Sequence, residues 1–142
     1  MNINKSNIIF FIYILIIFLS SCSYVGRTIG MDHPLLCRCQ TFPIACIQPS
    51  GIFIVEYNIS ELNEANKYFV EGSATYTGSI GWEFYKGALF TLFLVENGVI
   101  VETVSVAGGH GSSDRTIKFA REFTAQNKFE AVLINLRIKV YR

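Results

Sequence analysis

The sequence predicts an all-β protein, an antiparallel β-sandwich of about five to seven short strands with at most one short helix. Three observations carry this prediction. Residues 68–79 alternate between a small apolar face and a hydroxylated face, and residues 131–141 alternate almost to the end of the chain. The dipeptide Asn97-Gly98 stands between two apolar alternating runs. Alternation with a period of two is typical of strands, and Asn-Gly is a strong hairpin signal.

The first part of the predicted sheet covers residues 52–79. Residues 52–57 are mostly β-branched or aromatic, which suits a pleated surface. Residues 60–66 are rich in helix formers, and Ser60 is a suitable cap for one or two helical turns that connect two strands. Residues 68–79 then form a half-buried strand. Its small apolar face carries Tyr68, Val70, Gly72, Ala74, Tyr76 and Gly78.

A β-hairpin is expected within residues 89–106, around the dipeptide Asn97-Gly98. Asn-Gly supplies the two positive φ values of a type I′ turn, and this turn places Leu94 opposite Val101. Both faces of the resulting hairpin are apolar. Such a hairpin is normally central in a sheet and covered on each side. The cover is either the rest of this chain, with its N-terminal segment, or a partner chain.

The C-terminal part of the sheet is expected to end with a paired strand at residues 131–141. Residues 115–123 before it fit a strand or a helix, and the favoured interpretation is a strand that runs to about Phe119. The alternation of the last strand gives an inward face that carries Val132, Ile134, Leu136, Ile138 and Val140.

The N-terminus has the layout of a secretory signal. Lys5 is followed by twelve consecutive apolar residues, 8–19. This run is shorter than the roughly 20 residues that a helix needs to span a bilayer. The run ends in Leu19-Ser20-Ser21-Cys22, which resembles the lipobox of bacterial lipoproteins. This resemblance implies that residues 1–21 are removed and that Cys22 becomes the acylated N-terminus. An ordinary secretory signal and an uncleaved anchor are the alternatives.

The resemblance also implies a location in the bacterial cell envelope, with the membrane as a partner through the lipid on Cys22. One acyl chain holds a protein reversibly, whereas two or three chains on one residue hold it firmly. The next residue is Ser23 and not aspartate. In lipoproteins of enteric-type bacteria this implies sorting to the outer membrane, facing the periplasm.

Removal of residues 1–21 leaves one domain's worth of chain. The mature chain has 12 minus 1, or 11, Lys+Arg against 11 Asp+Glu, because Lys5 is removed. A net charge near zero gives no reason to expect nucleic acid as a partner. All three prolines lie in residues 22–50. This segment is therefore expected to be a tether, and residues 51–142 are expected to be the β-sandwich domain.

Three cysteines, Cys37, Cys39 and Cys46, lie close together in the predicted tether. An exported protein meets an oxidising compartment, so two of these cysteines are expected to form a disulfide. The third thiol is then left without a partner in this group. In the chain-entropy model, a disulfide that closes the loop from Cys37 to Cys46 would raise the free energy of unfolding by about 2.5 to 3 kcal/mol. The alternatives are unpaired thiols and a soft-metal site made of His33 and the three thiolates, although their spacing matches no standard zinc pattern.

Two further candidates for ligand or partner contacts are His110 and Trp82. His110 lies in a loop with two serines and an aspartate, residues 107–114. Members of a catalytic triad usually come from separate elements, so a contact residue or a plain connection is preferred to catalysis here. Trp82 lies in the aromatic run at residues 80–85, which suits a partner-binding rim or an aromatic plug at the end of the sandwich.

The sequence therefore predicts a lipid-anchored envelope lipoprotein that acts without catalysis. It would bind or scaffold another envelope component, with an envelope protein or a second copy as partner and no cofactor besides the lipid. The alternative is a periplasmic metal-binding or thiol-redox module built on Cys37, Cys39, Cys46 and His33.

Overall fold

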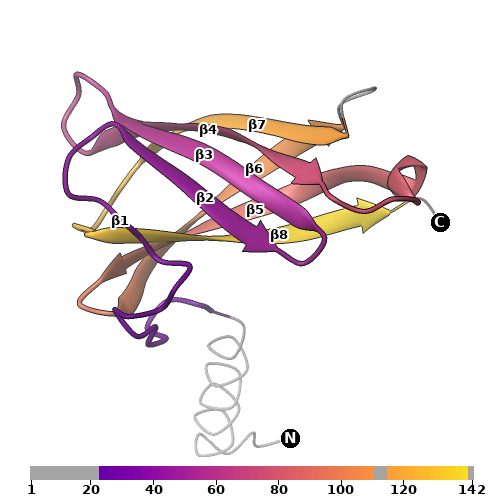
Figure 1. The fold of residues 1–142 in the computed structure, drawn as a ribbon. Helices are drawn as coiled ribbons and strands as arrows, with labels where there is room; N and C mark the ends of the chain where they lie inside the picture. The colour runs from indigo at the N-terminus through magenta and orange to yellow at the C-terminus, as the bar shows by residue number, and fades with distance from the viewer. Residues whose placement is uncertain (1–22, 111–114, 141–142) are drawn as a thin grey trace, which may run out of the picture.

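The computed structural model describes residues 23–110 and 115–140, which form one antiparallel sheet of eight strands (Figure 1). Its spatial order is β1-β8-β5-β6-β7-β4-β3-β2. No helix in the described part is long and apolar enough to cross a bilayer. The elements are β1 (Cys37–Arg38), β2 (Ile44–Ser50), β3 (Phe53–Glu61), β4 (Lys67–Tyr76), a 3-10 turn η1 (Trp82–Phe84), β5 (Tyr85–Glu96), β6 (Val99–His110), β7 (Thr116–Thr124) and β8 (Ala131–Val140).

The sheet curls until its first and last strands, β1 and β2, meet at a seam. A disulfide joins Cys37 on β1 to Cys46 on β2. The buried side chain of Gln48 on β2 donates to the carbonyl of Ile134 on β8 and accepts from its N–H at 3.1 Å. The all-β class is confirmed. A single, nearly closed barrel-like sheet of eight strands takes the place of the predicted sandwich.

The prediction that residues 22–50 form a tether is the one that departs most from the structure. This segment supplies two of the eight strands, β1 and β2. β2 pairs with β3 over its whole length, from Ile44 opposite Ile59 to Ser50 opposite Phe53. Alternate residues of β2 are buried, and this alternation was obscured because the polar Gln48 takes one of the inward positions. The sheet therefore begins before residue 51, within the segment expected to be a tether.

The short helix predicted at residues 60–66 is wrong. Ser60 pairs with Phe69 at the end of β3, and the chain then makes a hairpin turn. Asn66 has a positive φ of 59° in this turn. Strand pairing overrides the local helix propensity of this segment.

The predicted type I′ turn is confirmed, since Asn97 and Gly98 have positive φ values of 49° and 74°. The register beyond the turn is not as predicted. A bulge leaves Val101 without a direct partner, so Leu94 lies opposite Glu102. The bulge turns the following residues of β6 over, and Val104 and Val106 point into the barrel with Leu94.

The outer apolar face of this hairpin is covered by the chain itself. Phe93, Val95, Ile100 and Ala131 form a second cluster outside the barrel, and Ile29, Met31, Leu36 and Leu133 pack against it. The sequence left two possible covers for this face, the chain's own N-terminal segment or a partner chain. In the structure the N-terminal segment covers it.

The remaining strands fill the barrel. β7 continues beyond Phe119 to Thr124, further than predicted. The inward face of β8 is as expected at Val132 and Ile134, whereas Val140 at its end is 53% exposed. Across the interior, Phe90 on β5 stacks on Phe119 on β7, with ring centroids 4.0 Å apart.

Candidate functional site

The wall of the barrel opens between β6 and β7. Within the described residues these two strands pair only at Gly109 opposite Lys118 and at His110 opposite Ile117, and from there they diverge. The opening is a groove of about 440 Å³, which we call the β6–β7 groove. Its lining residues are Lys67, Glu102, Thr103, Val104, Ser105, Arg121, Glu122, Phe123 and Thr124.

Side chains span the β6–β7 groove where backbone ladders would otherwise form. The guanidinium of Arg121 on β7 donates to the carbonyl of Ser105 on β6. The carboxylate of Glu102 on β6 accepts from the backbone N–H of Gln126, at 2.7 Å, beyond the end of β7. Paired strands lie about 4.7–4.9 Å apart, so their backbone groups bond directly and no long side chain is needed to bridge them. The groove is therefore wider than a normal strand spacing.

The groove is polar and carries both signs of charge. Lys67 lies 3.0 Å from the carboxylate of Glu64 and 3.8 Å from that of Glu122. The hydrogen bond to Glu64 is the largest cause that raises the pKa of Lys67. Lys67 therefore keeps its positive charge at the rim of the groove at neutral pH.

Sequence reasoning missed this groove, although one signal for it exists. Phe119, Arg121 and Phe123 follow one another with the period of a strand, and both phenylalanines are buried in the barrel. Arg121 takes an inward position of the alternation yet is exposed. A charged residue at such a position indicates an opening in the wall.

Trp82 belongs to an aromatic cluster at the end of the barrel where β5 begins. Its ring lies 5.8 Å from that of Tyr76 and 6.2 Å from that of Tyr85, and Trp82 packs against the barrel core while partly buried. This placement suits the aromatic plug better than a free rim. His110 ends β6 at the same end of the barrel, so residues 107–110 of the predicted loop belong to a strand. The other half of that loop, residues 111–114, lies outside the described residues.

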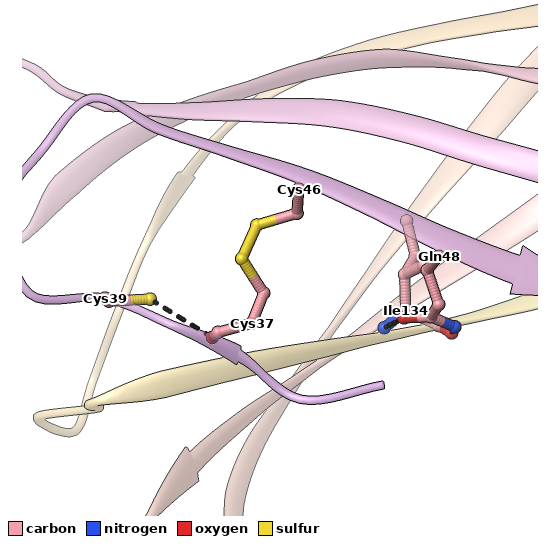
Figure 2. The surroundings of a disulfide bond; sticks show 5 residues. All are labelled: Cys37, Cys39, Cys46, Gln48 and Ile134. Atoms are coloured by element: carbon pink, nitrogen blue, oxygen red, sulfur yellow. Dashed lines mark hydrogen bonds between the residues drawn. A yellow bond between two sulfur atoms is a disulfide. The ribbon is translucent and has the colours of Figure 1, made fainter. Parts of the chain in front are cut away.

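The cysteines lie at the seam between β1 and β2 (Figure 2). Cys37 and Cys46 form the disulfide, and Cys39 keeps a thiol that donates to the carbonyl of Cys37 at 3.9 Å. Burial raises the pKa of the Cys39 thiol to about 12. The thiol is therefore protonated at neutral pH, and it is a poor nucleophile and a poor metal ligand.

This burial predicts slow alkylation of Cys39 in the folded protein. At pH 8, a pKa of about 12 in place of 9.0 leaves about a thousandth of the thiolate of an ordinary cysteine. The labelling rate should rise with pH up to the point of unfolding and should jump in denaturant. Mass spectrometry of iodoacetamide-treated protein measures it. Rapid labelling of native protein at pH 8 would contradict the burial of Cys39.

The metal alternative assigned a ligand role to His33, which is exposed on the N-terminal side of β1. Its Nδ1 accepts from the backbone N–H of Leu35 at 3.3 Å. Among residues 23–110 and 115–140 there is no group of three His, Cys, Asp or Glu side chains arranged to hold a metal. Cys22, the predicted site of lipid attachment, lies outside these residues.

No protein-family model matches this chain, and no significant similarity links it to a curated protein or to a solved structure. Its function is therefore inferred from its sequence and from the geometry of its barrel.

Proposed function

We propose that this chain is a lipid-anchored lipoprotein of the bacterial cell envelope that binds an extended segment of another envelope protein in the β6–β7 groove. It acts without catalysis, as a binding or scaffolding module. The observation that carries the proposal is the interrupted pairing of β6 and β7. Unpaired strand edges are ready templates for a strand from another chain.

A second observation supports strand addition at β6. The backbone N–H and C=O of Ile100 both bond to residues of the N-terminal segment, the N–H to the carbonyl of Arg27 and the C=O to the N–H of Gly26. Ile100 pairs with Val95 of β5 on its other side. This edge of β6 thus already makes backbone hydrogen bonds to another segment of the chain, a turn at residues 24–27, a few residues before the β6–β7 groove.

The charges of the groove favour a polar partner segment. Arg121 and Glu102 line it from opposite strands, and Lys67 and Glu122 stand at its rim. An incoming strand would take over the carbonyl of Ser105, which now accepts from Arg121. The released guanidinium would then be available for a carboxylate on the partner. We therefore expect a partner segment with alternating polar residues and at least one acidic side chain.

Site-specific photocrosslinking in intact cells tests this function. A photoreactive residue at Thr103, in the groove, should capture one defined envelope protein, whereas the same residue at Asn58, exposed on the outside of β3, should not. Combining the Thr103 probe with Arg121→Glu should sharply reduce capture, because an added negative charge repels an acidic segment. Combining it with Cys22→Ser should abolish capture, since the protein is no longer held at the membrane.

The outcomes separate the two parts of the proposal. Equal capture from Thr103 and Asn58, or none from either with the acylated protein abundant, would reject the groove as the binding surface. Unchanged capture in the Cys22→Ser variant would reject the need for a lipid anchor.

A further inference from the structure

The N-terminal segment, residues 23–31, is fixed to the barrel at the tip of the β5–β6 hairpin. The N–H of Ile29 donates to the carbonyl of Gly98 at 2.6 Å, and Thr28 forms a bridge with Val99. Ile29 and Met31 also pack on the outer apolar cluster. Backbone hydrogen bonds and apolar burial together hold this segment, so it does not act as a flexible spacer.

Apolar and aromatic side chains of this segment remain in solvent. Tyr24 packs on Phe93 with ring centroids 4.9 Å apart, yet it is 44% exposed, and Val25 is 48% exposed. The guanidinium of Arg27 lies 5.1 Å from the centroid of the Tyr24 ring. Tyrosine and arginine with an apolar neighbour are the combination that suits the boundary between lipid and water.

The position of these residues in the chain indicates what covers them. Tyr24 comes two residues after Cys22, and an extended residue spans at most about 3.3–3.6 Å. Two residues of chain therefore reach at most about 7 Å from Tyr24. Acyl chains on Cys22 would enter the bilayer at that distance from the barrel, too short for the barrel to stand clear of the headgroups.

We propose that the headgroup layer of the bilayer is the partner of this surface, with Tyr24, Val25 and Arg27 in contact with it. The barrel then has a fixed orientation. The tip of the β5–β6 hairpin faces the membrane, and the end that carries Trp82 faces away (Figure 1). β5 separates the two ends by roughly 35 Å. This inference rests on the proposed acylation of Cys22.

The single tryptophan of the chain provides the test. Full-length protein, purified in its acylated form, is inserted into phosphatidylcholine vesicles whose acyl chains carry bromine, a short-range quencher of tryptophan fluorescence. Native Trp82 should be hardly quenched. In the Trp82→Phe background, Val25→Trp should be strongly quenched, whereas Ile80→Trp, at an 84% exposed position near η1, should behave like native Trp82.

Mass spectrometry of the N-terminal peptide separates the two ways to fail. If Cys22 is acylated and Val25→Trp is not quenched, the barrel stands off the membrane and the orientation is rejected, while the lipoprotein proposal survives. Equal quenching at residues 25 and 80 in acylated protein also rejects the orientation, since the barrel would then lie on its side. If Cys22 is not acylated, both the proposed lipid anchor and the orientation are rejected.

Discussion

Gln48→Ala is expected to lower the free energy of unfolding by about 3 kcal/mol, because two buried backbone groups lose their partner and each costs about 1–3 kcal/mol. Gln48 is 4% exposed, and its amide serves both the N–H and the C=O of Ile134. In this way one side chain replaces a strand pairing where β2 faces β8 directly, beyond the end of the short β1. Urea unfolding followed by circular dichroism measures the loss.

Gln48→Met is the matched variant, because methionine fills a similar volume and makes neither hydrogen bond. Most of the destabilisation should persist in it, and hydrogen exchange at the Ile134 amide should accelerate. Gln126→Ala, which removes an exposed amide, should change stability by less than about 0.5 kcal/mol. Wild-type stability of Gln48→Met would show that packing, and not the amide, closes the seam.

The features that the sequence predicted correctly depend on local patterns. The type I′ turn follows from Asn97-Gly98, since few other residue pairs accept two positive φ values. The inward faces of β4 and β8 follow from strict alternation, with Val70 and Ile134 buried as expected. In each case the information lies within one strand or one turn.

The features that the sequence did not reveal depend on how distant strands meet. β2 was hidden because Gln48 interrupts its apolar alternation, and the partner that makes a buried glutamine acceptable, Ile134, lies 86 residues away. The bulge at Val101 shifts the register between β5 and β6, and the hairpin sequence alone carries no signal for it. The β6–β7 groove arises from the divergence of two strands, and its one sequence signal is the position of Arg121.

A glycine on β4 illustrates how closely the barrel interior is packed. A Cβ atom added at Gly72 would overlap the backbone carbonyl oxygen of Glu56 and would lie 2.7 Å from the ring of Phe119. Gly108 leaves room for Phe90 in the same way, at 2.5 Å. The stacked pair of Phe90 and Phe119 thus occupies space that these two glycines leave open.

Gly72→Ala is accordingly expected to destabilise the protein by about 3 kcal/mol, at the upper end of the usual cost of overpacking. The contact with Glu56 involves backbone, so relief requires β3 and β4 to move apart at their pairing. Gly109→Ala is the control, because an added Cβ there meets nothing within 4 Å. It should leave stability unchanged or slightly higher, since alanine has the smaller conformational freedom when unfolded. Equal unfolding midpoints in urea for the two variants would mean that the barrel wall yields at Gly72, and that the stacked rings are not held by close packing against β4.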